Sequence, residues 1–225
     1  MAVDRRRFVA TLVTAGAAGL AAGSAAPALA AAADGDPPSP LPAEPWDLSW
    51  LDTLKGKHKQ VFDCANSDLT KGTPLVVVRN FLDAHKTVFG LEHPAIDTIV
   101  GIAVDAFPMN VGDAVWARYA LGERWKIKEP GSDAWATRNV FLDAPAGAPG
   151  ANMTVRAMQA RGTLFWQCNN ALNFVARQLA TATQRTQDEV RADLLRGLNP
   201  GVRLVPAHTM AVGLVQERGC TYEKL

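Results

Sequence analysis

The hydrophobic positions after residue 60 alternate between short apolar runs and longer stripes with helical spacing. Most of the runs are rich in β-branched residues, as in parallel strands that are covered on both faces. Between the runs, apolar residues recur every three or four positions, which is typical of the buried face of a helix. The expected strands are QVFDC, DTIVGIAVDA, TLFWQC, VRLVP and CTYEKL. The alternation predicts an α/β protein with a mostly parallel sheet and helices on both faces.

Capping and breaking residues set the expected helix boundaries. Pro74 suits the first turn of a helix that ends near Gly90. Asn169 and Asn170 are candidate caps for a helix that follows TLFWQC. Thr186 and Glu189 have the spacing of a capping box. Further helices are expected over 113–125, 153–161 and 208–218, and a short amphipathic one over 46–54, with 107–110 as a loop.

The first 45 residues differ in composition from the rest of the chain. Residues 1–30 combine Arg5 and Arg6, a weakly apolar stretch and a final A-x-A site, as in a cleaved twin-arginine signal peptide. Residues 31–45 are rich in Pro and Ala without periodicity, which favours a tether. We therefore expect export, to the periplasm or beyond, without stable membrane insertion after cleavage.

Residues 46–225 are expected to form a single domain with one long insertion. The segment 126–150 is rich in Gly, Pro, Ala and Asp and separates two expected helices. Connections of this length are usually functional or disordered.

Charge and motif content exclude several function classes. The chain carries 23 Lys plus Arg against 22 Asp plus Glu, so it lacks the basic excess of a nucleic-acid-binding protein. It has no C-x-x-C pair, zinc-ligand spacing, haem motif or glycine-rich nucleotide loop. The sequence therefore predicts no metal site and no cofactor.

The last 70 residues resemble the DsrE/DsrF-like family of sulfur-relay and related proteins. The resemblance lies in RGTLFWQCNNAL, a strand that ends in Cys and enters a helix, and in NPGVRLVPAHTMAVGLVQERGCTYEKL, a strand, helix and strand. It extends over residues 60–225 at the level of topology. It implies a three-layer α/β/α domain with five parallel strands in the order 4-3-2-1-5, an oligomeric assembly, and in some members a persulfide at the position of Cys168.

Cys168 is the main candidate functional residue. It ends an expected strand and precedes a helix, where backbone amides and the helix dipole favour a thiolate. His208 begins a helix at the same sheet edge, so a thiol–imidazole contact is geometrically possible. The alternatives are an inert buried cysteine and an exposed capping histidine.

Six further polar residues are candidate ligand-binding positions, of which Asn169 and Asn170 directly follow Cys168. Asp63 and Asn66 surround the end of the first strand, where they are either cleft residues or turn formers. Arg138 and Asn139 lie in the insertion, where they either reach an anionic ligand or occupy a surface loop. The strand order that the resemblance implies separates Cys64 from Cys168 by two strands. Cys220 begins its strand and therefore lies at the opposite edge of the sheet, so no intrachain disulfide is expected.

Two functions remain in competition. The first is an exported protein that binds or carries a small sulfur species on Cys168, as a carrier more than as a turnover enzyme. The second is a non-catalytic homo-oligomeric module that binds a small ligand or partner and in which Cys168 is structural.

Overall fold

The computed structural model describes residues 46–225, which fall within one compact unit. The expected signal peptide, 1–30, and tether, 31–45, lie outside these described residues. Within 46–225, no helix combines the length and apolar character that crossing a membrane requires.

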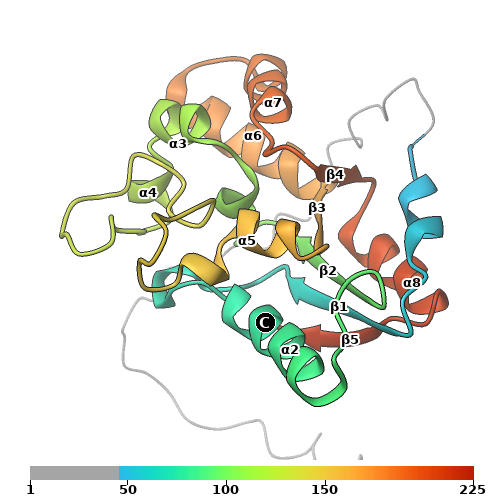
Figure 1. Cartoon of the computed structure of the whole chain (residues 1–225). Helices are drawn as coiled ribbons and strands as arrows, with labels where there is room; N and C mark the ends of the chain where they lie inside the picture. Colours follow the sequence, from blue (N-terminus) through green and yellow to red (C-terminus); the bar gives the residue numbers. More distant parts are fainter. Residues whose placement is uncertain (1–45) are drawn as a thin grey trace, which may run out of the picture. The chain divides into compact units, whose positions relative to one another are not determined.

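A five-stranded parallel sheet forms the centre of the domain (Figure 1). Every neighbouring pair of strands is parallel, so the predicted α/β class is confirmed. The order β4-β3-β2-β1-β5 is the one expected from the resemblance. The strands are β1 (His58–Cys64), β2 (Ile96–Ile102), β3 (Leu164–Cys168), β4 (Val202–Val205) and β5 (Thr221–Lys224).

Helices connect the strands and cover both faces of the sheet. Within the described residues they are α2 (Leu75–Phe89), α3 (Asp113–Tyr119), α4 (Leu121–Arg124), α5 (Val155–Ala160), α6 (Asn169–Thr183), α7 (Gln187–Arg196) and α8 (His208–Glu217). Short 3-10 turns are η1 (Ser49–Thr53), η2 (Leu69–Lys71), η3 (Phe107–Asn110) and η4 (Ala151–Met153). The expected capping box at Thr186 and Glu189 is present.

Four local expectations were wrong. The helix expected over 113–125 is two helices, because Ala120 adopts a left-handed conformation with φ 49° between α3 and α4. The helix expected over 46–54 is only the 3-10 turn η1, and the expected loop 107–110 is the 3-10 turn η3. The cap of α6 is Cys168, whose side chain accepts the Ala171 N–H, so Asn169 and Asn170 are the first helical residues.

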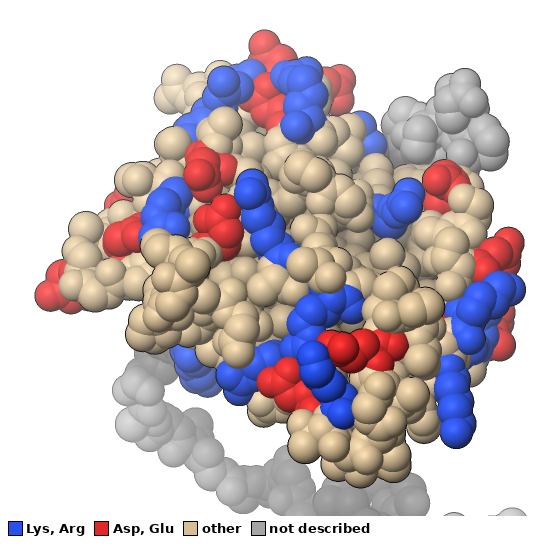
Figure 2. Space-filling model, in the orientation of Figure 1, with Lys and Arg blue, Asp and Glu red and all other residues tan. Residues whose placement is uncertain are grey.

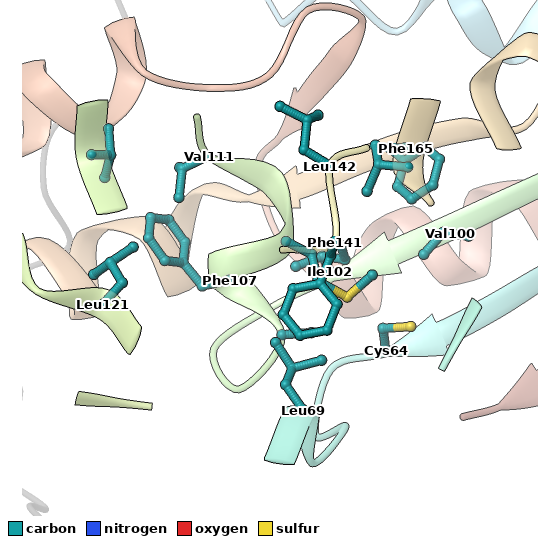
Figure 3. Packing of buried hydrophobic residues seen from close by; sticks show 14 of the residues in the cluster. Cys64, Leu69, Val100, Ile102, Phe107, Val111, Leu121, Phe141, Leu142 and Phe165 are labelled. Atoms are coloured by element: carbon teal, nitrogen blue, oxygen red, sulfur yellow. The ribbon is translucent and has the colours of Figure 1, made fainter. Parts of the chain in front are cut away.

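Alternation along the strands divides the core into two clusters, one on each face of the sheet. Phe62, Val100 and Phe165 face the larger cluster, which includes apolar residues of α2, α5 and α6; Figure 3 shows part of it, with Val100, Ile102 and Phe165 labelled. Their neighbours Val61 and Trp166 face the smaller cluster, with η1 and α8.

The insertion 126–150 folds against this domain. Ile127, Phe141 and Leu142 are buried, and Lys128 pairs with Trp135 in an isolated antiparallel bridge. The segment therefore contributes its own part of the core, although it contains no helix or strand of its own. On the face shown in Figure 2, acidic and basic side chains are interspersed, as the balanced composition suggests.

Candidate functional site

The candidate site lies at the carboxyl edge of the sheet, around the sulfur of Cys168. This residue ends β3 and caps α6, and it is 5% exposed. Its Sγ accepts a hydrogen bond from the Ala171 N–H at 3.4 Å and another from the His208 N–H at 3.3 Å. The first amide belongs to the start of α6 and the second to the start of α8.

Both donors to the sulfur are helix-start amides. The amides at a helix N-terminus have no partner within the helix, and they carry the positive end of the helix dipole. Here two helices direct one such amide each to a single sulfur atom. The sulfur of Cys168 therefore lies where the amides of two helix starts converge.

The imidazole of His208 is engaged away from the sulfur. Its Nδ1 accepts the indole N–H of Trp166 at 3.2 Å, and its Nε2 lies 2.9 Å from Oδ1 of Asp63. This distance is short enough for an ion pair, but Nε2 is not oriented for a hydrogen bond to the carboxylate. Hydrogen bonding thus joins Cys168 to the backbone of His208, while the ring contacts Trp166 and Asp63.

Two hydrogen-bond donors hold the carboxylate of Asp63. Tyr222 donates its hydroxyl to Oδ2 at 2.6 Å, and the Ala65 N–H donates to Oδ1 at 2.8 Å. Burial opposes ionisation, but these hydrogen bonds and His208 outweigh it and hold the pKa of Asp63 below its usual value. Burial lowers the pKa of His208 against the opposing effect of Asp63. The hydrogen bond to Asp63 raises the pKa of Tyr222 to about 12.

Strand register explains why these side chains share one face. Asp63 lies opposite Gly101 of β2, and Gly101 lies opposite Trp166 of β3. A Cβ at Gly101 would lie 2.5 Å from the Trp166 ring, so only glycine leaves room for the indole that reaches His208. Gly101 was not among the expected site residues, although a glycine within a buried apolar strand was the available signal.

Of the other residues expected at the site, two have structural contacts and two are exposed. Asn169 is buried and accepts a hydrogen bond from Arg191 of α7 at 3.1 Å. Asn170 and Asn66 are exposed, the latter in the turn after β1. Asn139 is buried and donates to the carbonyl groups of Met109 and Val111.

The insertion residue Arg138 lies beside a separate cavity. It forms an ion pair with Glu129 and lines a cavity of about 800 Å³ whose lining does not include Cys168. The structure therefore brings Cys168, His208 and Asp63 together and leaves Arg138 in another place.

The three cysteines are free and buried, but their surroundings differ. Burial raises the pKa of Cys64 to about 12 and that of Cys220 to about 11. Cys168 is the one whose sulfur accepts two helix-start amides. Among residues 46–225, no group of three or more His, Cys, Asp or Glu side chains is arranged to hold a metal ion.

Comparison with known proteins adds little to this geometry. No protein-family model matches the chain, and no curated protein matches it. One similar solved structure is a protein of unknown function from Methanobacterium thermoautotrophicum, with 12% identity and a TM-score of 0.36, covering 75% of this chain and 99% of that one. At this TM-score the likeness supports no argument about fold or function.

Proposed function

We propose that the protein binds and carries one sulfane sulfur atom on Cys168. The observation that supports this function is the pair of backbone amides, from Ala171 and His208, that both donate to Sγ. A structural cysteine needs no such donors, whereas a sulfur that bears negative charge does. The DsrE/DsrF resemblance of the strand that ends in Cys168 points in the same direction.

The chemistry is a sulfur exchange without net oxidation. The Cys168 thiolate attacks the terminal sulfur of a persulfide or polysulfide donor, R–S–S⁻. A bond forms between Sγ and that sulfur, the S–S bond of the donor breaks, and R–S⁻ leaves as a thiolate. The negative charge on the terminal sulfur of Cys168–S–S⁻ is then close to the same amides. Transfer to an acceptor reverses these steps.

His208, Asp63 and Trp166 serve as positioning residues in this proposal. Their contacts fix the first residue of α8, and with it the amide that faces Sγ. The low exposure of Cys168 restricts access to small donors and protects the persulfide from bulk thiols. This favours a carrier over an enzyme that turns over a large substrate.

Export through the twin-arginine route and homo-oligomerisation belong to the same proposal. They rest on the signal-like residues 1–30 and on the family resemblance. A carrier on this route folds before it crosses the membrane, so Cys168 is already enclosed by its two helices when it reaches the oxidising side.

Mass spectrometry of the protein after exposure to inorganic polysulfide tests the proposal. We expect an added mass of about 32 Da on the peptide that contains Cys168. The same treatment of Cys168→Ser should give no stable adduct, while Cys220→Ala should be loaded as well as the unchanged protein. Loading of Cys64 or Cys220 in place of Cys168 would reject the assignment. Failure of every small donor to load Cys168 would favour the alternative, a ligand-binding module with a structural cysteine.

A further inference from the structure

We infer that the cavity formed by the insertion and the η2 turn is a second binding site, for an organic monoanion with an apolar body. The inference does not depend on the sulfur chemistry of Cys168. The cavity holds about 800 Å³, within the range of roughly 300–1,000 Å³ typical of small-molecule sites. Residues 69–73 form one side, and residues 126–154 form the rest. The insertion is the loop beside α4 in Figure 1.

The apolar part of the lining suits an aromatic or branched aliphatic group. Phe141, Val140 and Met153 line the cavity together with several prolines. Trp135 also lines it and is 43% exposed, which is high for so large an apolar side chain. A half-exposed tryptophan at the edge of a cavity offers stacking area at low entropic cost.

The charges of the lining favour an anion. Both acidic side chains are already neutralised, Glu129 by Arg138 and Asp143 by Arg156 at 3.4 Å. Among the basic side chains, Lys128 pairs with Asp133 at 2.7 Å. Lys126 forms no ion pair with any residue of 46–225, and it is exposed. One uncompensated cation remains beside an apolar cavity, which matches a single carboxylate or sulfonate.

The backbone of Lys126 is a second and independent indication. Its φ is 56°, which is a left-handed conformation. The residue that follows the C-cap of a helix, as Lys126 follows Trp125 of α4, commonly has this conformation and is usually glycine. The chain has lysine there, at a cost in local strain that glycine would avoid. Because this strained residue lines the cavity, we infer that the lysine side chain serves binding there.

Binding of two fluorescent probes to the full mature protein tests this site. 1-Anilinonaphthalene-8-sulfonate carries an apolar body and one negative charge, and N-phenyl-1-naphthylamine is the same body without the charge. We expect the anionic probe to bind about tenfold more tightly, as one hydrogen-bonded charge pair allows. An excess of 1-naphthoate, a carboxylate, should displace it.

Three variants separate this site from nonspecific dye binding. Lys126→Gly should weaken the anionic probe by about tenfold, leave the neutral probe unchanged, and keep or raise the melting temperature because glycine accepts the left-handed φ. Trp135→Ala should weaken both probes. Lys57→Ala, an exposed lysine outside the cavity, should change neither.

Several results would overturn the inference. These are absence of binding by the anionic probe, equal affinity for both probes, and an unchanged affinity in Lys126→Gly. Cys168→Ser should bind the anionic probe like the unchanged protein, so failure of the sulfur proposal and failure of this one are measured separately.

Discussion

The indole N–H of Trp166 donates a hydrogen bond to Nδ1 of His208 across 3.2 Å. This bond requires an unprotonated Nδ1, so the ring carries its proton on Nε2, which faces Asp63 at 2.9 Å. A second proton on the ring would break the contact with Trp166. The ring is therefore poorly suited to take a proton from Cys168, and the contribution of His208 to the sulfur is its backbone N–H.

Two substitutions of His208 separate the amide from the ring. His208→Ala removes the imidazole and keeps the N–H. His208→Pro removes both, and proline is well tolerated at the first residue of a helix; the preceding Ala207 already has the extended conformation that proline requires (φ −145°, ψ 141°). We expect Cys168 to react with iodoacetamide somewhat more slowly in His208→Ala, because the ring no longer fixes the start of α8, and several-fold more slowly in His208→Pro, which also lacks the amide. Equal rates in the two variants would show that the amide is unimportant.

The reactivity order of the three cysteines follows from their surroundings. Burial raises the pKa values of Cys64 and Cys220 to about 12 and 11, so both are almost wholly neutral thiols near pH 7. We predict that a small alkylating reagent modifies Cys168 first, as read from each cysteine's own peptide by mass spectrometry. Faster labelling of either of the other two would contradict this order.

Protonation of His208 should make the stability of the fold depend on pH. Its pKa is 6.5 in the unfolded chain and lower in the folded protein, so between these two values the unfolded chain binds more protons. The free energy of unfolding should therefore fall as pH decreases through about 6.5 and level off below the folded pKa. The loss is about 1.4 kcal/mol for each pH unit that separates the two pKa values.

Urea unfolding across this pH range measures the effect. His208→Gln, which does not titrate, should lose less stability over the same interval. The depressed pKa of Asp63 acts separately, because its contribution is lost only at pH values below the usual 3.8 of an aspartate. An equal loss of stability in His208→Gln would assign the pH dependence to other groups.

Gly101→Ala should destabilise the protein and disturb the site together. The added Cβ would lie 2.5 Å from the Trp166 ring, and both residues are in the central strands, where the backbone has little room to shift. Overpacking of this kind costs about 1–3 kcal/mol or more. We expect a lower urea midpoint and slower alkylation of Cys168. As a control, Gly213→Ala in α8 meets no atom within 4 Å; it should keep or raise the urea midpoint, because alanine has the higher helix propensity, and leave the alkylation of Cys168 unchanged.

The sequence was sufficient for the sheet because its central strands β2 and β3 are buried on both faces and appear as apolar runs between helical stripes. It also placed Cys168 at a strand end, since the run TLFWQC stops there. The cap of α6 was assigned to Asn169 and Asn170 because cysteine is an uncommon cap. The break at Ala120 was not predictable, because alanine ordinarily favours a continuous helix.

The contacts of the site depend on relations that one sequence does not contain. Trp166 reaches His208 because the register places its ring over Gly101, and registers follow from the packing of the whole sheet. The expected thiol–imidazole contact assumed that the side chain of His208 would point at the sulfur. The partly buried Asp63 and the buried Trp166 hold the ring instead, and the amide is what remains beside Cys168.

The most direct test of sulfur transfer is the amount of sulfur that the loaded protein gives up to cyanide. Cyanide takes the terminal sulfur of a persulfide as thiocyanate and leaves the cysteine thiolate, so thiocyanate counts transferable sulfur atoms. After polysulfide treatment and desalting, we predict one thiocyanate per chain from the unchanged protein and from Cys220→Ala, and none from Cys168→Ser. An undiminished yield from Cys168→Ser, or no thiocyanate from the unchanged protein, would contradict the claim that Cys168 carries sulfur.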